Sequence, residues 1–255
     1  MTHVKVAVLG AAGRMGQEAV KAIRGAGDLE LVAQVDPAGH GPHAIGEVAL
    51  ANVAVDFTTP GAVLDNVRFC IDHGVHAVVG TTGWTPDRLD TVRGWLADAG
   101  ESAPHVLVVP NFGIGAVLMM RFAQLAAPWF ESVEIVELHH PGKHDAPSGT
   151  ARRTAELIAA AREESGRGPA PDATREEASL AGARGAAVAG IPVHGLRLAG
   201  LVAHQEVLFG TEGETFTLRH DSLDRVSFMP GVLLAVRGVG GLPGLTVGID
   251  ALLGL

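Results

Sequence analysis

Three glycines near the amino terminus constrain the fold of this chain more than any other feature. Gly10, Gly13 and Gly16 form the pattern G-x-x-G-x-x-G. They follow an apolar run over residues 4–9 that is typical of a buried strand, and residues 14–26 after them have the pattern of a helix. A glycine-rich turn in this context lets backbone N–H groups approach a pyrophosphate, and the helix start adds partial positive charge. The turn therefore predicts a dinucleotide site.

Asp36 supports this prediction from the end of the second expected strand. A carboxylate at that position accepts hydrogen bonds from the adenosine ribose hydroxyls. Its charge opposes a 2′-phosphate, and residues 37–40 contain no Arg or Lys to hold one, although Arg14 in the glycine turn partly compensates. We therefore expect NADH or NADPH as cofactor, with NADH favoured or equal. Two simpler interpretations stay open: a glycine turn without a ligand, and an Asp36 that only ends a strand before a proline.

The first 112 residues alternate between short apolar runs and helical patterns. Runs without polar alternation suit a parallel sheet that is covered on both faces. The expected strands are residues 4–9, 29–36, 53–57, 76–81 and 105–109, and the clearest helices are residues 14–26, 62–73 and 86–99. This order predicts an α/β fold with a Rossmann-type, doubly wound parallel sheet.

The pattern changes after residue 112. Helices are expected over residues 113–130 and from 148 to about 165, a strand over 133–139, and three strand-like runs between 191 and 222. Consecutive strands without helices between them predict a second, α+β domain on a mixed or antiparallel sheet. Residues 166–190 are expected to be a long surface loop with one helical turn near residue 176, and the chain returns to helix over 230–237. We expect residues 1–112 with 223–255 to bind the dinucleotide, and residues 113–222 to bind the substrate.

The charge balance and the single cysteine limit the classes of function. The chain has 28 acidic and 19 basic residues, and no basic cluster interleaves with aromatic residues, so we expect no nucleic acid partner. Arg121 and Gln124 interrupt the most apolar segment, so we expect no membrane span. Cys70 has no partner for an internal disulfide, and the first strand starts too early for a signal peptide, so we expect a cytoplasmic location. An anionic substrate would need a local positive site to overcome the net charge.

Such a site is expected just after the strand over residues 133–139. Lys143 is a point charge, and the start of the helix at Ser148 offers N–H groups and a hydroxyl to a carboxylate. Hydride addition to a conjugated C=N system creates negative charge, which an imidazole can protonate and a lysine can stabilise. Because strand side chains alternate between faces, the adjacent His139 and His140 should have different roles.

Three simpler interpretations of this segment stay open. Ser148 is expected to cap the helix whatever else it does. The polar residues could also lie at the surface without chemistry. A metal cluster is the third, but His139 and His140 are adjacent and no His-x-x-x-His pair is present, so we expect no metal.

The segment Glu-Leu-His-His-Pro-Gly-Lys-His-Asp-Ala-Pro-Ser-Gly-Thr-Ala, residues 137–151, resembles the signature of the dihydrodipicolinate reductase family. Other matching motifs occur in order at residues 10–16, 56–60, 79–83, 110–112, 208–214 and 220–222, with Arg225 and Phe228. The resemblance therefore extends over essentially the whole chain, and the actinobacterial branch is the most similar.

The resemblance implies reduction of the cyclic imine dicarboxylate formed by loss of water from 4-hydroxy-tetrahydrodipicolinate. The product is tetrahydrodipicolinate, in lysine and diaminopimelate biosynthesis. It implies that His139 is the general acid/base and Lys143 the second catalytic group. The residues implied to hold the substrate carboxylates are His140, Ser148, Gly149 and Thr150.

The resemblance also implies the cofactor site and the assembly. The pyrophosphate cradle would be Gly10, Ala11, Ala12, Gly13, Arg14 and Met15, and Asp36 would bind the ribose. The nicotinamide side would be lined by Gly80, Thr81, Thr82, Val109, Pro110, Asn111 and Phe112. Ala12 stands where some relatives carry a lysine, which supports the expectation for NADH. Members of this family are homotetramers that associate through the sheets of their second domains, so a homotetramer is expected.

Two rival functions belong to other classes. One is a different two-domain reductase, such as an amino-acid or semialdehyde dehydrogenase, but the Ser-Gly-Thr segment near Lys143 argues against it. The other is a non-catalytic NAD-sensing protein, which would keep the glycine turn but would not need His139 or Lys143.

Overall fold

The computed structural model describes residues 3–36 and 44–255. The chain forms two compact units, Met1–Gly113 with Phe228–Leu255, and Ile114–Ser227. One unit contains a parallel sheet with helices and the other a mixed sheet with helices. The expected fold class, a Rossmann-type doubly wound sheet with a second α+β domain, is confirmed.

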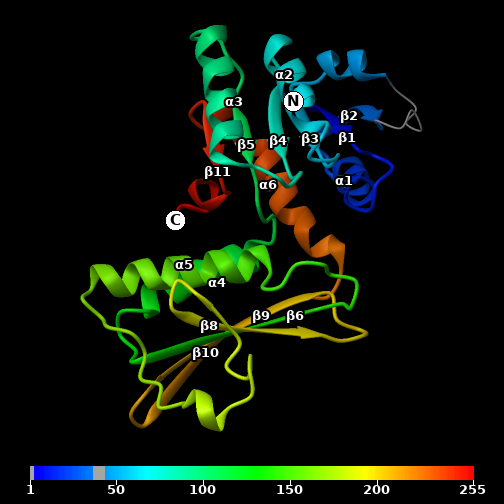
Figure 1. Cartoon of the computed structure of the whole chain (residues 1–255). Helices are drawn as coiled ribbons and strands as arrows, with labels where there is room; N and C mark the ends of the chain where they lie inside the picture. The colour runs from blue at the N-terminus through cyan, green and yellow to red at the C-terminus, as the bar shows by residue number, and fades with distance from the viewer. Residues whose placement is uncertain (1–2, 37–43) are drawn as a thin grey trace. The chain divides into compact units, whose positions relative to one another are not determined.

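The first unit is a six-stranded sheet in the order β11-β5-β4-β3-β1-β2, in which every pair of neighbours is parallel (Figure 1). Its strands are β1 (Val4–Leu9), β2 (Leu29–Val35), β3 (Val53–Asp56), β4 (His76–Val79), β5 (Val106–Val108) and β11 (Leu245–Val247). Its helices are α1 (Arg14–Gly25), α2 (Val63–Asp72), α3 (Pro86–Ala99) and α6 (Met229–Gly238). Its short 3-10 helices are η1 (Ile45–Leu50), η4 (Val239–Gly241) and η5 (Asp250–Leu253), and η3 (Arg225–Phe228) leads into α6.

Both faces of this sheet are covered, as the apolar runs predict. Ala7 and Leu9 of β1 belong to a core cluster with the buried residues of α2 and α3. The alternate residues Val6 and Val8 are also fully buried, so the opposite face is covered as well. Parallel strands that are buried on both faces can carry valine at consecutive positions, which explains the absence of polar alternation.

The second unit is a five-stranded sheet in the order β10-β9-β6-β8-β7, in which β6 and β8 are parallel and the other neighbours antiparallel. Its strands are β6 (Ser132–His139), β7 (Ala186–Val188), β8 (Ile191–Arg197), β9 (Ala203–Thr211) and β10 (Glu214–Ser222). Helices α4 (Ile114–Ala126) and α5 (Gly149–Glu164) lie together over one face of this sheet, and η2 (Glu176–Ala178) lies in the long connection after α5 (Figure 1). We call this face the helix-covered face and the other the open face.

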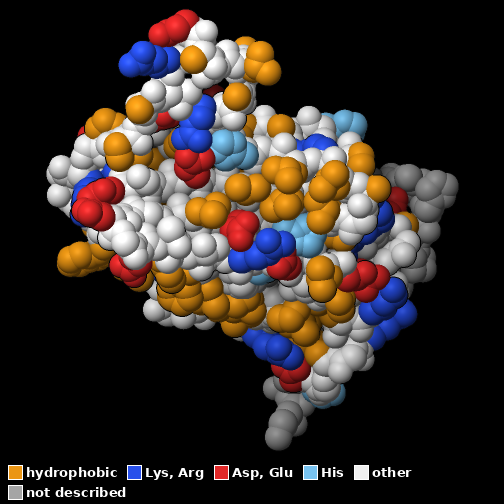
Figure 2. Space-filling model, turned by 90° about the horizontal axis from the view of Figure 1, so that it is seen from below, with side chains coloured by type: hydrophobic (Ala, Val, Ile, Leu, Met, Phe, Trp, Pro, Cys, Tyr) orange, Lys and Arg blue, Asp and Glu red, His pale blue; other side chains and the backbone are white. Residues whose placement is uncertain are grey.

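Alternation along β6 assigns side chains to the two faces. Val133 and Ile135 are buried in the core with α4 and α5, so Glu137 and His139 share their face. Val136 and Leu138 point to the open face and are only half-buried. The view from below shows apolar side chains interspersed with charged ones and histidines (Figure 2).

Several expected boundaries were wrong. The strands of the first unit after β1 end one or two residues earlier than expected, and β5 also begins one residue later. Helix α4 ends at Ala126 rather than at residue 130, because Pro128 cannot continue a helix. Residues 166–190 are not only a loop, since they contain β7. Strand β11 and the 3-10 helices other than η2 were not expected.

Candidate active site

The register of the parallel sheet aligns the ends of its four central strands. Their last paired residues lie side by side in the order Leu9, Asp56, Val79 and Val108. The next residues therefore form a row at the carboxyl edge of the sheet: Gly10, Phe57, Gly80 and Val109. Strand order reverses between β1 and β3, so Gly10 and Phe57 flank the topological switch point, where open α/β sheets bind ligands.

Backbone packing accounts for two of the three glycines in the turn. Gly10 has a φ of +75°, and a Cβ there would lie 2.5 Å from the carbonyl oxygen of Phe57. A Cβ on Gly16 would lie 2.0 Å from the carbonyl oxygen of Gly10, so only glycine lets α1 start this close to β1. Gly13 is the N-cap of α1 and brings no capping side chain. The N–H groups of the first helical turn thus have no such side chain to compete with an anion, and the cradle fits a pyrophosphate.

Asp36 lies directly beside this turn. Its Oδ2 accepts a hydrogen bond of 3.3 Å from the backbone N–H of Ala12, which ties the end of β2 to the glycine turn. A carboxylate in this position suits a ribose next to a pyrophosphate. Residues 37–40, which bear on the 2′-phosphate, lie outside the described residues.

The expected nicotinamide side divides into buried supports and exposed residues. A Cβ on Gly80 would lie 2.3 Å from the Phe57 ring and 2.7 Å from the Phe112 ring. These two rings pack edge to face with centroids 5.5 Å apart. Three of the expected residues are buried: Thr81, Val109 and Phe112. Asn111 is half-buried, and its side-chain oxygen accepts from the backbone N–H of Gly113. Thr82 and Pro110 are exposed. The supports therefore shape the edge, and the exposed residues can face a ligand.

The buried Asp56 carboxylate ties the ends of neighbouring strands together. It is 2 % exposed and accepts hydrogen bonds of 2.8 and 2.7 Å from the backbone N–H and hydroxyl of Thr58. The hydroxyl of Thr81 donates at 2.7 Å, and the amide of Asn66 donates at 2.8 Å. These four donors fix Thr81 and the turn after β3.

His139 ends β6 and forms a pair with Glu137 on the helix-covered face. The distance from His139 Nδ1 to Glu137 Oε2 is 2.5 Å. A carboxylate can only accept, so Nδ1–H is the donor and the other ring nitrogen, Nε2, is left for proton exchange. Burial lowers the pKa of His139 below its ordinary value, and the opposing effect of Glu137 only partly offsets this.

Glu137 is the centre of a hydrogen-bond network. Its side chain is 0 % exposed, and Arg197 of β8 donates to both of its oxygens at 2.8 Å. The backbone N–H of Ser148 donates to Oε1 at 3.2 Å. Burial acts to raise the pKa of Glu137, but the hydrogen bonds from Arg197 and His139 outweigh it and hold the pKa below its ordinary value.

The loop between β6 and α5 joins the same network. Lys143 Nζ donates to Asp145 at 2.8 Å, and this hydrogen bond lowers the pKa of the Asp145 carboxyl despite partial burial. Arg197 also donates to the carbonyl oxygen of Asp145 at 2.7 Å. Lys143 acts to lower the pKa of His139, as expected for a nearby positive charge. The structure thus places His139 and the start of α5 around one buried carboxylate, and Arg197 connects that carboxylate to the loop that carries Lys143.

The start of α5 is built as an N-cap. Ser148 is 3 % exposed, and its hydroxyl accepts from the backbone N–H of Ala151 at 3.2 Å. The capping role expected for Ser148 is therefore present, and Gly149 and Thr150 form the first turn of the helix. His140 is half-buried and lies beside Gly142, in a turn that the backbone N–H of Lys143 closes by donating to the His140 carbonyl oxygen at 3.2 Å.

Comparison with known proteins gives one consistent family. The model of the dihydrodipicolinate reductase N-terminus matches residues 4–112, and that of the C-terminus matches residues 115–253. The chain is 60 % identical over 255 residues to a 4-hydroxy-tetrahydrodipicolinate reductase of Streptomyces coelicolor, covering 100 % of both chains. It is 61 % identical over 252 residues to the Nocardia farcinica protein of the same name, covering 99 % of both. A solved structure, dipicolinate-bound dihydrodipicolinate reductase from Paenisporosarcina sp. TG-14, has a TM-score of 0.84 and 39 % identity, covering 98 % of this chain and 99 % of that one.

The chain belongs to the dihydrodipicolinate reductase family. Membership in this family confirms the reductase activity expected from the sequence. The chain is an oxidoreductase that acts on a small molecule. The match of residues 4–112 to the family's amino-terminal half indicates use of a nicotinamide dinucleotide.

Three residues that organise the two groups of expected site residues were missed by sequence reasoning. Glu137 and Asp56 were named only inside motifs, and Arg197 was not named at all. A signal was present for Glu137, because it follows Val133 and Ile135 with a period of two and so had to be a buried carboxylate on the same face as His139. No local signal marks Arg197, which is 60 residues away in sequence.

Two further histidines of the second unit have different surroundings. His204 is 6 % exposed, and its Nε2 accepts from the backbone N–H of Val202 at 3.2 Å, so its Nδ1–H donates to Asp221 at 2.7 Å. His220 lies on the helix-covered face against Gly115, where an added Cβ would come within 2.6 Å of its ring. Burial lowers the pKa of His220.

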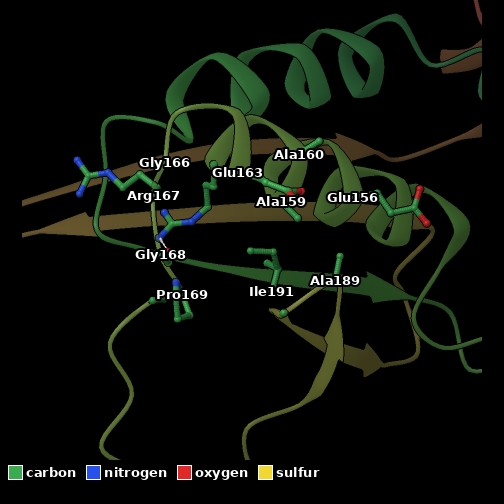
Figure 3. Close-up of a pocket in the computed structure, with 13 residues that line it drawn as sticks. Glu156, Ala159, Ala160, Glu163, Gly166, Arg167, Gly168, Pro169, Ala189 and Ile191 are labelled. Carbon is green, nitrogen blue, oxygen red and sulfur yellow. Dashed lines mark hydrogen bonds between the residues drawn. The ribbon is translucent and has the colours of Figure 1, made fainter.

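A pocket of about 660 Å³ lies elsewhere, between α5 and residues 166–170 and 189–191. Glu156, Glu163 and Arg167 are the charged residues labelled among those that line it (Figure 3). The buried Arg162 donates to the carbonyl oxygens of residues 127, 130, 131 and 168, which makes it a structural clamp rather than a ligand-binding group. None of the expected site residues lines this pocket.

Two features are absent from residues 3–36 and 44–255. This part of the chain contains no cluster of three or more His, Cys, Asp or Glu side chains arranged to hold a metal ion. No helix described in it has the length and apolar character needed to span a membrane.

Proposed function

We propose that the chain reduces the cyclic imine dicarboxylate formed by loss of water from 4-hydroxy-tetrahydrodipicolinate, giving tetrahydrodipicolinate in lysine and diaminopimelate biosynthesis. The observation that carries this proposal is the pairing of His139 with a buried carboxylate, beside Lys143 and the start of α5. The chain that contains this pair is 60 % identical to a relative named 4-hydroxy-tetrahydrodipicolinate reductase. In this proposal residues 1–112 with 223–255 bind the dinucleotide, and residues 113–222 bind the substrate.

His139 is assigned the proton transfer that accompanies reduction. Its Nδ1–H is engaged by Glu137, so Nε2 is the atom that gives up or takes a proton. Because burial lowers its pKa, the protonated ring is a stronger acid than an exposed imidazolium. Lys143 is the second catalytic group, and its positive charge stabilises negative charge that develops on the substrate.

The substrate carboxylates are assigned to the start of α5 and its neighbours. Helix N-termini bind anions through backbone N–H groups that lack an intrahelical partner. Gly149 and Thr150 supply the first turn, Ser148 fixes it through its cap, and His140 approaches from the preceding turn. These groups, with Lys143, supply the local positive site that a chain of net charge −9 needs for a dianion.

The cofactor is assigned to the carboxyl edge of the parallel sheet. The nicotinamide supplies the hydride when it is bound. Residues 10–15 hold the pyrophosphate and Asp36 the ribose, while Gly80, Thr81, Thr82 and residues 109–112 form the nicotinamide side. The Asp36 carboxylate beside the Ala12 N–H opposes a 2′-phosphate, so NADH is favoured over or equal to NADPH.

The open face of the second sheet is assigned to assembly as a homotetramer in the cytoplasm. Leu196 and Leu208 are 37 % and 38 % exposed, and Val136 and Leu138 lie half-buried between them on the central strand. An apolar centre with a charged rim is typical of subunit interfaces. Light scattering coupled to gel filtration tests this, and a monomer in solution would reject it.

One experiment tests the reaction and the cofactor together. The substrate is generated in situ from pyruvate and aspartate semialdehyde by the preceding synthase, and oxidation of NADH and of NADPH is followed with wild type, His139→Ala and Lys143→Ala. We expect wild type to be active and each variant to lose about 100-fold or more in kcat. An inactive wild type rejects the function, full activity in both variants rejects the residue roles, and a preference for NADPH by orders of magnitude rejects the role of Asp36.

A further inference from the structure

We propose that Glu137 is a positioning residue of this reaction, fixed by Arg197, that holds His139 in the one orientation and tautomer in which Nε2 exchanges the proton. The inference rests on the proposed function of His139 and adds a residue to it. Glu137 touches neither substrate nor cofactor in this scheme and acts through the histidine.

The geometry leaves Glu137 a single arrangement. Both of its oxygens are engaged: Oε2 by His139 and Arg197, and Oε1 by Arg197 and the backbone N–H of Ser148. The side chain is 0 % exposed, so water cannot replace any of these donors. A carboxylate that accepts from a planar, bidentate guanidinium cannot rotate without breaking both hydrogen bonds.

This arrangement determines which nitrogen of His139 carries the proton in the neutral ring. An isolated imidazole can place its proton on either nitrogen, but a carboxylate facing Nδ1 selects the Nδ1–H form. A glutamine in place of Glu137 would lose that selection, because its side chain can present either an oxygen or an NH₂ group to the ring. It would also remove the negative charge that stabilises the imidazolium.

The same carboxylate connects His139 to the groups assigned to the substrate. Its hydrogen bond with Ser148 N–H fixes the residue that caps α5. Arg197 extends the connection to the carbonyl oxygen of Asp145, whose carboxylate holds Lys143. The acid and the anion-binding groups therefore share one anchor, and displacement of Glu137 would move them relative to one another.

The chain offers a matched control on the opposite face of the same strand. Glu134 of β6 pairs with His194 at 2.6 Å and with Arg184, so it belongs to a second Glu–His–Arg group. Its side chain is 34 % exposed, and none of its partners is assigned to the reaction. Glu134→Gln removes the same charge from the same strand. Because Glu134 lies on the face assigned to assembly, light scattering verifies that the variant keeps the wild-type assembly, and the reaction should be unchanged.

The experiment compares wild type, Glu137→Gln, Glu137→Asp and Glu134→Gln with two readouts. The first is the pH profile of kcat/KM with the substrate generated in situ. The second is the rate at which diethyl pyrocarbonate modifies His139, located by mass spectrometry of peptides over a range of pH. Only the neutral ring reacts, so the pH at which the modification rate is half its maximum reports the pKa of His139 without any substrate. We call this pH the modification midpoint. The charged groups that influence His139 are Glu137, Lys143, Asp145 and Arg197.

We expect Glu137→Gln to lower kcat/KM by about 100-fold. The modification midpoint and the alkaline limb of the pH profile, where the protonated ring is lost, should both move to lower pH, by about one unit, because the negative neighbour of the imidazolium is gone. Glu137→Asp keeps the charge but is one methylene shorter, so the midpoint should stay close to wild type while kcat/KM recovers only in part. Glu134→Gln should match wild type in both.

The outcomes separate the inference from the proposed function. A Glu137→Gln protein with an unchanged midpoint and kcat/KM within threefold of wild type overturns the inference. Equal losses in Glu137→Gln and Glu134→Gln overturn it as well, because they would indicate a general effect on the sheet. A wild type that oxidises no cofactor rejects the proposed function, and the modification midpoints then still decide whether Glu137 controls His139. If Glu137→Gln does not fold, Glu137→Asp is the test. An unchanged modification midpoint with a lowered kcat/KM supports the inference, and a wild-type value of kcat/KM overturns it.

Discussion

Two Glu–His–Arg groups centred on glutamates of the same strand, β6, have the same composition but different surroundings. Glu137 lies on the helix-covered face with a side chain that is 0 % exposed, and Glu134 lies on the open face with one that is 34 % exposed. Both carboxyls have a pKa below the ordinary value, because hydrogen bonds from the partner arginine and histidine outweigh the effect of burial. The pKa direction alone therefore does not separate a site residue from a surface ion pair.

The difference lies in what else each carboxylate holds. Glu137 also accepts from the backbone N–H that begins α5, and its arginine reaches the loop that carries Lys143. Glu134 shares its arginine with Asp172, a residue of the long connection after α5. A buried ion pair is costly to form and costly to break, whereas an exposed pair is screened by water. Burial thus makes one group a rigid anchor and leaves the other replaceable.

The largest expected effect comes from removing Arg197, and removal of Arg184 is the comparison. Arg197→Met leaves a buried carboxylate without its bidentate partner, so the free energy of unfolding should fall by about 3 kcal/mol or more. Arg184→Met exposes the Glu134 oxygens to water, so its unfolding midpoint in urea should stay close to wild type. Equilibrium unfolding in urea measures both. Equal destabilisation of the two variants would contradict the distinction between the faces.

A smaller effect is expected from adding one methyl group beside Glu137. Gly195 of β8 lies opposite Glu137 in the sheet, and a Cβ there would be 3.2 Å from Glu137 Oε1. Gly195→Ala should press on the carboxylate, lower kcat/KM and cost about 1 to 2 kcal/mol of stability. Gly210→Ala on β9 is the control, since a Cβ at Gly210 meets no atom within 4 Å. An alanine at Gly195 that leaves both kcat/KM and stability unchanged would show that the network tolerates displacement.

A feature could be predicted from the sequence when the residues that produce it lie close together along the chain. The glycine turn is a local pattern, because a Cβ on Gly16 would meet the backbone of Gly10 and Ala11, although the contact that excludes a Cβ at Gly10 comes from Phe57 after β3. Among the five expected strands of the first unit, β3, β4 and β5 are short runs with nearly every residue buried, whereas β2 mixes buried residues with partly exposed ones such as Gln34. Strand β11 has only three residues and gains its place by pairing with β5, so no local pattern could reveal it.

The active site shows the same limit. The cluster at the end of β6 was visible because His139, Lys143 and Ser148 lie within ten residues of one another. The partner that organises it could not be predicted, because Arg197 comes from a strand 60 residues later. The register of β6 against β8 brings Arg197 opposite His139 and next to Glu137. Tertiary pairing, rather than a motif, therefore completes the site.

The smallest expected effect is in the pH dependence of stability, and it separates the histidine from the carboxylate within one group. His139 has a lowered pKa in the folded chain, so its contribution to stability is present above the unfolded pKa of about 6.5 and is lost as pH falls through the folded pKa. Glu137 also has a lowered pKa, so its contribution is present above about pH 4.3 and is lost as pH falls below that. His139→Gln should therefore flatten the decline of the unfolding free energy between pH 7.5 and 5.5, the range about one unit on either side of an ordinary histidine pKa. His139→Gln should still show the decline of the unfolding free energy below about pH 4.3, whereas Glu137→Gln should reduce that decline. Urea unfolding at a series of pH values measures both limbs, and a His139→Gln curve parallel to wild type across the upper range would mean that the buried ring contributes no pH dependence.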